Sequence, residues 1–251
     1  MTMAETNDLQ YADVHRDVVR SIVETGPRYY VTLVTAIGVT LLCFFFPWFY
    51  QLYYGLGAAG MNHPTVWGTY LASFIFWIGL SHSGTLLSCV LHLTNSPWRK
   101  AMYRSAEAMT LFSLMVAATF VMVHVGRPWF VHWAAPYPNQ MEMWPNFRSP
   151  LMFDVMAITT YLTGSSIFIY IGSIPDFAAV RDRTTGWRNH MYALLSLGWR
   201  GTDMEWHCLH WAYTFLAVLI IPLAVSVHSI VSWDFALSIV PALHQTIFAP
   251  Y

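Results

Sequence analysis

Five long runs of apolar residues follow one another along the chain, and shorter polar or charged stretches separate them. A helix needs about 20 apolar residues to cross the hydrocarbon core of a bilayer, and each run reaches that length. We therefore expect five transmembrane helices, at roughly 29–53, 65–93, 102–126, 150–173 and 209–232. The predicted fold class is all-α: a polytopic membrane protein with one N-terminal helix followed by a four-helix transmembrane bundle.

The connections between the runs differ in character. The 127–149 loop is rich in Pro and Trp, and the 174–208 loop is the longest and most charged. Within the latter, residues 187–200 mix apolar, aromatic and basic side chains, which predicts a segment that lies flat at the interface. The expected divisions are a cytoplasmic N-terminal segment at 1–28, the first helix with its outer loop at 29–64, the bundle at 65–233 and an outer-face segment at 234–251.

The two ends of the chain carry further expectations. Residues 1–28 are polar and carry both signs of charge, so the first span is expected to act as an uncleaved anchor. The sequence stops at Tyr251, soon after a span and without a polar tail, and we expect that the natural chain continues beyond it.

The composition supports an integral membrane protein. Hydrophobic residues make up 56% of the 251 positions and charged residues only 10%, whereas a soluble domain carries about 25% charged residues. A net charge of −1 gives no basis for nucleic-acid binding. Because Cys43, Cys89 and Cys208 are far apart and form no CxxC spacing, we expect no disulfide, covalent haem or iron–sulfur cluster in this chain.

The basic residues predict the orientation, since cytoplasmic loops carry an excess of Lys and Arg. With the N-terminus in the cytoplasm, only Arg127 and Arg148 lie outside. The other ten lie inside: Arg16, Arg20, Arg28, Arg99, Lys100, Arg104, Arg181, Arg183, Arg188 and Arg200. We expect a multi-pass protein of the bacterial inner membrane with a cytoplasmic N-terminus.

Two ionisable residues, His124 and Asp154, lie just inside the ends of the third and fourth spans, at similar depth on the outer side. His228 and Asp234 reach the same level at the end of the fifth span. Quinol oxidation releases two protons, which a neutral His and a carboxylate can accept near neutral pH. The pattern favours a quinol site with His124 and Asp154 catalytic and Asp234 and His228 binding. In the plainer interpretation, the aspartates cap helices and His124 is a satisfied core histidine.

A polar stripe follows the second span. His82, Thr85, Cys89 and His92 are three, four and three residues apart, so they share one helix face. Such a stripe either holds helices together or conducts protons. The two histidines, with Glu107 at the start of the third span, indicate a proton path through His82, Glu107, His92 and Thr85. Small hydroxyl side chains favour the packing interpretation.

Metal and haem are the alternatives to these interpretations. His207 and His210 are one turn apart with Glu205 before them, but no third ligand is specified, and we expect no metal site. Haem b needs two axial ligands from facing helices. Histidines stand ten residues apart on one span and eighteen on another, which argues against two haems and leaves one haem open.

Several stretches resemble the NrfD/PsrC-type quinol-interacting membrane subunits, and within that family they are most similar to the ActC subunits of alternative complex III. The stretches are 79–85 (GLSHSGT), 104–110 (RSAEAMT), 124–129 (HVGRPW), 144–150 (WPNFRSP) and 227–235 (VHSIVSWDF). The resemblance covers most of the chain from about residue 65 onward. ActC-like proteins are about twice as long and contain two bundles, so the resemblance implies that this chain corresponds to their N-terminal half.

The resemblance implies a quinol oxidoreductase subunit that is not catalytically complete alone. Members are four-helix bundles without haem that bind a quinone near the outer face and pass electrons to an iron–sulfur partner outside the membrane. By position, His124, Asp154 and Asp234 match the quinol site, and His82 and Glu107 match the polar interior proposed for proton movement. The implied cofactor is menaquinone or ubiquinone, and the implied partners are an iron–sulfur subunit, a multihaem cytochrome c and other membrane subunits. The alternatives are a haem b-binding cytochrome subunit, and a proton-translocating or anchor subunit without its own quinol site.

Overall fold

The structure, a computed structural model, describes residues 24–61, 68–134 and 151–239, together with residues 13, 16–18 and 20. Within these ranges the side chains of 133–134, 151–154 and 233–239 are outside the description.

Every regular element in the described ranges is helical. The long helices are α4 (Gly68–Leu93), α5 (Arg99–His124), α6 (Leu151–Arg181) and α8 (Asp203–Ile239). The first apolar run forms α2 (Pro27–Thr40), a π-helical turn (Leu41–Phe45) and α3 (Phe46–Tyr54). The short elements are the 3-10 helices η2 (Leu56–Ala59) and η3 (Pro128–Ala134) and the α-helix α7 (Trp187–Leu195). Five of these helical stretches are long and apolar enough to cross a membrane, which confirms the predicted all-α class with five spans.

The π-helical turn in the first span has a local cause. Pro47 has no N–H, so it cannot donate the helical hydrogen bond to the carbonyl of Cys43. The irregular turn at Leu41–Phe45 ends two residues before this proline and includes Cys43, whose carbonyl lacks that donor, and a wider turn accommodates the missing bond.

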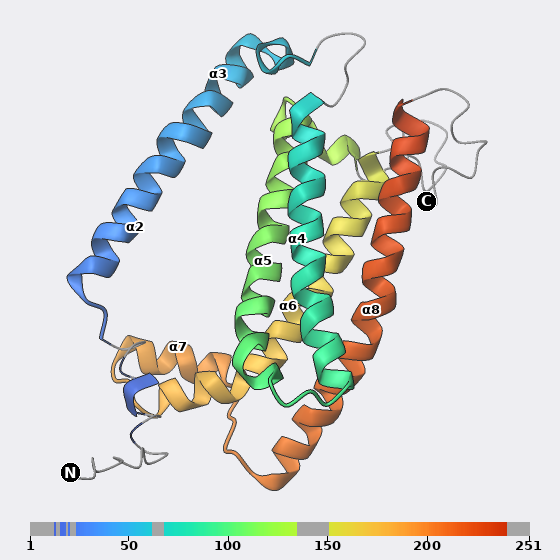
Figure 1. Cartoon of the computed structure of the whole chain (residues 1–251). Coiled ribbons are helices and arrows are strands. Elements are labelled where there is room, and N and C mark those ends of the chain that lie inside the picture. Colours follow the sequence, from blue (N-terminus) through green and yellow to red (C-terminus); the bar gives the residue numbers. More distant parts are fainter. Residues whose placement is uncertain are drawn as a thin grey trace, which may run out of the picture. The chain divides into compact units, whose positions relative to one another are not determined.

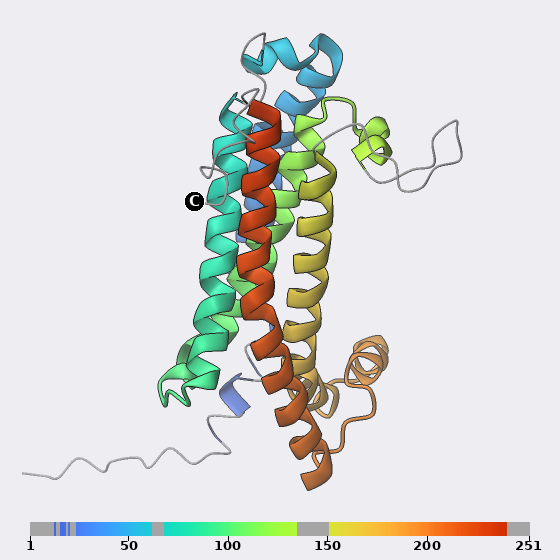
Figure 2. The ribbon, with the colours of Figure 1, turned by 90° about the vertical axis from the view of Figure 1, so that its right-hand side faces the viewer.

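The chain forms two compact units, and one of them consists of residues 45–171 with 209–251. In it α4, α5, the part of α6 up to residue 171 and the part of α8 from residue 209 lie side by side (Figures 1 and 2). Their facing sides make one core from Phe74, Ile78, Cys89, Leu114, Ala117, Val121, Ala157, Ile158, Tyr161, Phe168, Tyr213, Ala217, Ile220, Ala224, Val227 and Val231. Large apolar side chains such as Phe112 (66% exposed) and Phe215 (64% exposed) point outward, as expected of helices that meet lipid.

Small residues bring α4 and α5 close together. A Cβ atom added at Gly84 would lie 2.5 Å from the Ala106 carbonyl oxygen and 2.6 Å from Thr110 Oγ1. Lipid tails are as apolar as the helix surfaces, so membrane helices associate through such close packing and hydrogen bonds rather than through water exclusion. Gly84 therefore fixes the spacing at which polar side chains of the two helices can meet.

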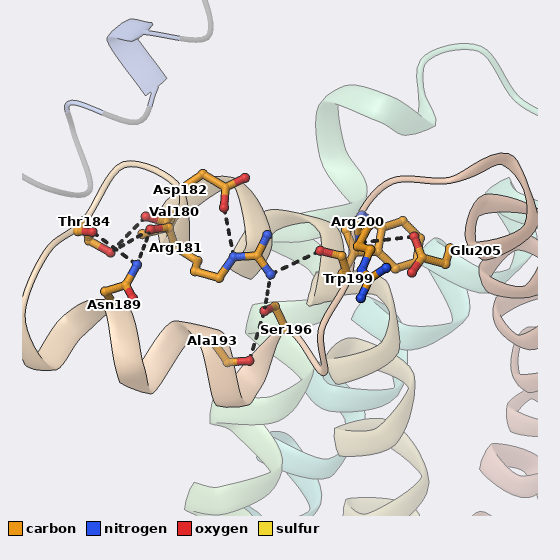
Figure 3. Close-up of polar contacts among 10 residues, drawn as sticks. All are labelled: Val180, Arg181, Asp182, Thr184, Asn189, Ala193, Ser196, Trp199, Arg200 and Glu205. Carbon is orange, nitrogen blue, oxygen red and sulfur yellow. Dashed lines mark hydrogen bonds and ion pairs between the residues drawn. The ribbon is translucent and has the colours of Figure 1, made fainter.

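The other unit contains residues 1–44 and 172–208, and Figure 3 shows its polar contacts. Arg181 donates from Nη1 to Ser196 Oγ and to the Trp199 carbonyl, both at 3.1 Å. Asn189 Nδ2 donates to the Arg181 carbonyl at 2.8 Å. These bonds tie α7 and the loop after it to the last turn of α6. These hydrogen bonds hold α7 in place within the charged stretch that the sequence predicts to lie at the membrane interface. The orientation of α7 to the bilayer stays a prediction.

Candidate functional site

A buried acid, Glu107, lies near the start of α5 inside the bundle and is 1% exposed. Its Oε1 accepts hydrogen bonds from Ser88 Oγ of α4 (2.9 Å) and from the Tyr213 hydroxyl of α8. Its Oε2 lies 3.3 Å from Arg104 Nη1. We call these four residues the Glu107 cluster. Three helices thus supply polar partners to one carboxyl group, as a buried polar group requires.

Histidine and arginine side chains surround the Glu107 cluster at this end of the bundle. His92 Nε2 lies 2.8 Å from Thr214 Oγ1, and the His92 ring meets the Tyr213 ring edge to face, with centroids 4.8 Å apart. The Arg99 guanidinium lies 5.0 Å from the Tyr213 ring centroid, within the range of a cation–π contact. The structure therefore brings predicted path residues His92 and Glu107 to a common neighbour, Tyr213.

A ladder of hydroxyl groups continues along the α4–α5 seam. Thr85 Oγ1 donates to Thr110 Oγ1 at 3.0 Å, and Thr110 Oγ1 lies 3.0 Å from the Ser81 carbonyl oxygen. Thr85 and Thr110 are each 1% exposed. This ladder depends on the close approach at Gly84, because a larger residue there would push the two helices apart.

His82 lies deeper in the same core, 3% exposed, between rings of two other helices. Its ring stacks on Tyr161 of α6, with centroids 4.4 Å apart and an interplanar angle of 11°, and also meets the ring of His228 of α8 at 4.3 Å. His82 Nδ1 lies 2.8 Å from the Ile78 carbonyl, so this nitrogen carries the proton when the ring is neutral. His82 of the predicted path thus touches His228 of the predicted quinol site.

Four buried polar atoms around this ring find no hydrogen-bond partner: Ser81 Oγ, His82 Nε2, the Tyr161 hydroxyl and Ser165 Oγ. The hydroxyls of Ser81, Thr85 and Ser165 lie close enough to that of Tyr161 to interact with it. An unpaired buried polar group costs roughly 1–3 kcal/mol. Buried polar groups in native structures nearly always have a partner, so this concentration in one place needs an explanation.

His124 lies at the opposite end of α5 from Glu107 and is 8% exposed. Beside it, Gln51 of α3 (3% exposed) donates from Nε2 to the Val123 carbonyl at 3.1 Å and accepts a hydrogen bond from the Tyr70 hydroxyl. The chain turns at Gly126 with φ of 75°, a left-handed conformation that glycine adopts without strain. Residues of α3 and α4 therefore fix the backbone beside His124.

The remaining quinol-site predictions lie partly outside the described side chains. Asp154 belongs to the first turn of α6 and Asp234 to the last turns of α8, but nothing of their side chains is described. The end of α5, the start of α6 and the end of α8 do lie at the same end of the bundle (Figures 1 and 2). The pairing of Asp154 with His124 stays a prediction.

Sequence reasoning missed Gln51, Tyr161, Ser165 and Tyr213. A signal existed for Gln51, the one side-chain amide in the first apolar run. Tyr161 and Ser165 are four residues apart on the face of α6 that also carries Phe168, which is helical spacing. Tyrosines at such positions could equally belong to an interfacial belt, so the pattern alone did not assign them to the interior.

Glu205, one of the candidate metal ligands, has a different role here. Glu205 and Thr202 form a capping box at the start of α8: Glu205 Oε2 accepts from the Thr202 N–H at 2.9 Å, and the Glu205 N–H donates to Thr202 Oγ1 at 3.3 Å. Across the described ranges, no group of three or more His, Cys, Asp or Glu lies together as metal ligands would. The His82 and His228 rings touch directly and leave no space between them for a porphyrin.

Comparison with known proteins gives a consistent picture. The family model described as polysulphide reductase, NrfD, matches residues 57–251. A putative membrane subunit of the dimethyl sulfoxide reductase of Halobacterium salinarum is 28% identical over 189 residues, which cover 75% of this chain and 39% of that protein. A subunit of the selenate reductase of Mesobacillus selenatarsenatis is 24% identical over 182 residues, 69% of this chain and 41% of that protein. The chain thus spans about two fifths of the length of these curated relatives.

Proposed function

Because the chain belongs to the NrfD family and is a multi-pass integral membrane protein, we propose that it is the quinol-interacting membrane subunit of a multi-subunit oxidoreductase. The names of the two relatives, a membrane subunit of a dimethyl sulfoxide reductase and a subunit of a selenate reductase, support a place in a complex of the molybdoenzyme type. In such a complex the membrane subunit anchors its partners and supplies them with electrons from quinol.

The observation that carries this proposal is a pair of buried ionisable residues toward opposite ends of α5. Glu107 and His124 are both buried and stand seventeen positions apart, which corresponds to about 25 Å of helix. This approaches the thickness of about 30 Å of a bilayer's hydrocarbon core. Ionisable residues at such positions are costly and are kept where a task requires them.

We assign the quinol to the end of the bundle that carries His124. Asp154 and His124 accept the two protons of a quinol whose electrons leave the chain, so the quinol becomes quinone, two protons and two electrons. Asp234 and His228, on the last turns of α8, complete the binding site. The contact of His228 with His82 gives this site a neighbour in the bundle interior.

A proton path through the interior forms the second part of the proposal. Its members are Glu107, His92, Thr85 and His82, with the Tyr161 hydroxyl beside them. The hydrogen bond from Thr85 to Thr110 and the unpaired Nε2 of His82 support such a path. Its coupling to electron transfer would make the subunit a proton translocator as well.

In this proposal the groups that receive the electrons belong to other subunits of the complex. Electrons pass to an iron–sulfur subunit on the outer face and, in an alternative complex III-like assembly, to a multihaem cytochrome c. The quinone is menaquinone or ubiquinone, and the N-terminus is cytoplasmic. The excess of basic residues on one side supports that orientation.

Turnover of the purified complex with quinol and an artificial acceptor tests the site. Asp154→Asn keeps the shape of the side chain but cannot accept a proton, and general acid–base groups contribute about 10²–10⁴ to rates. We expect at least a 100-fold loss of turnover in a complex that retains all its polypeptides. Asp176→Asn is the matched control, the same exchange on an exposed residue of the same helix, and should keep wild-type turnover. Normal turnover in Asp154→Asn would remove the carboxylate from the site, and loss of the assembly would favour an anchoring role.

A further inference from the structure

A cavity of about 360 Å³ opens where α4 turns into α5, at the Glu107 end of the bundle. Four basic side chains line it: Arg99 and Lys100 of α5, His92 of α4 and His210 of α8. The polar residues Asn95 and Ser96 of the intervening turn complete the wall, and none of the lining residues is acidic. The α4–α5 turn at this end of the bundle can be followed in Figure 1.

The turn that forms one wall has a fixed backbone. The N–H of Ser96 donates to the Leu91 carbonyl at 3.1 Å, and the N–H of Asn95 donates to the His92 carbonyl at 3.1 Å. Asn95 adopts φ of 53°. This is a Schellman motif that ends α4, and Pro97 follows it as is common after such caps. The backbone of the α4–α5 turn is therefore preorganised on this side of the cavity.

The buried acid at this end of the bundle, Glu107, forms its ion pair with Arg104, which does not line the cavity. The described ion pairs of the chain involve neither Arg99 nor Lys100. Arg99 is held between the rings of Tyr103 (4.7 Å) and Tyr213 (5.0 Å), and its buried Nε has no hydrogen-bond partner.

The N-terminus of α5 adds to the positive potential. Its first turn carries Arg99 and Lys100 and no acidic residue, and Trp98 at its N-cap makes no side-chain capping bond. Helix N-termini carry a partial positive charge that favours anions, so two cations there are unfavourable without one.

We propose that this cavity binds the phosphate of an anionic phospholipid headgroup. Basic pockets between transmembrane helices recognise such headgroups. A cavity of this size lies within the range of small-ligand sites. Exposed apolar side chains next to it, Trp98 (51%), Met102 (45%) and Leu93 (37%), offer contact to the acyl chains. This inference does not depend on the quinol site proposed above.

The test titrates phosphatidylglycerol and phosphatidylcholine of identical acyl chains into the delipidated complex, with binding followed by native mass spectrometry. Wild type should prefer phosphatidylglycerol. The pair Arg99→Gln and Lys100→Gln should weaken phosphatidylglycerol binding about 30-fold, or about 2 kcal/mol, and leave phosphatidylcholine unchanged. Lys100→Gln alone, at an exposed position, should cost about fivefold and guards against misfolding of the double variant.

The control pair is Arg28→Gln with Arg183→Gln, which removes the same charge at exposed positions outside this cavity. It should retain the preference for phosphatidylglycerol. Equal binding of both lipids by wild type, or a preference that survives both the double variant and Lys100→Gln, would overturn the proposal. Displacement of phosphatidylglycerol by inorganic phosphate alone would show that free phosphate, not lipid, is the ligand.

Discussion

Replacing Gly84 by alanine should separate α4 from α5 and open the hydroxyl ladder between them. The new methyl group would lie 2.5 Å from the Ala106 carbonyl oxygen and 2.6 Å from Thr110 Oγ1, well inside van der Waals contact. Backbone at Ala106 cannot rotate away, so the helices must move apart. That movement stretches the 3.0 Å bond from Thr85 to Thr110.

The cost follows from two terms. Overpacking of a tight core costs roughly 1–3 kcal/mol, and loss of one buried hydrogen bond costs about 1 kcal/mol. Alanine gains up to ~1 kcal/mol over glycine in a helix interior. Gly79→Ala on the same helix receives this gain too, but a Cβ atom there would meet nothing within 4 Å. The helix term therefore cancels between the two variants, and their free energies of unfolding should differ by roughly 2–4 kcal/mol.

Equilibrium unfolding of the full chain in detergent, followed by tryptophan fluorescence, measures this difference. Gly84→Ala should unfold at lower denaturant concentration than wild type, and Gly79→Ala at the same or a higher concentration. If the two variants have equal free energies of unfolding, the close approach of α4 and α5 at Gly84 is wrong, and with it the ladder that the proton path requires.

Two further predictions concern the ends of the bundle. Glu107→Gln retains an acceptor for the hydroxyls of Ser88 and Tyr213 but cannot exchange a proton. In reconstituted vesicles, the number of protons moved per electron should therefore fall while quinol turnover persists. An unchanged number of protons per electron would exclude Glu107 from the path. Gln51→Ala and Tyr70→Phe should each destabilise the protein by about 1–2 kcal/mol, and the double variant by less than their sum, because each single change already breaks the Gln51–Tyr70 bond. Strict additivity would contradict that contact.

The helices could be predicted from the sequence because hydrophobicity and length decide whether a segment spans a bilayer. The apolar pattern predicts the third span at 102–126, and the helix runs from Arg99 to His124. The stripe His82, Thr85, Cys89 and His92 follows from helical periodicity alone. All four lie on the side of α4 that faces the bundle, with His82, Thr85 and Cys89 buried and His92 half-buried.

The contacts between helices could not be predicted in the same way. They depend on the rotation and height of each helix against its neighbours, which no single segment encodes. The bond of Tyr213 to Glu107 joins residues 106 positions apart, and the stacking of Tyr161 on His82 joins two helices. His228 illustrates the consequence: its depth assigned it to the quinol group, while its ring contact links it to the interior path.

Photo-crosslinking of an azido-quinone to the intact complex, followed by peptide mapping, tests the position of the quinol site without any substitution. We predict that the label is found on peptides of this chain that contain His124, Asp154 or the last turns of α8, and that excess unlabelled quinol suppresses it. A label confined to the Glu107 end of the bundle, or absent from this chain while other polypeptides of the complex carry it, would contradict the proposed site.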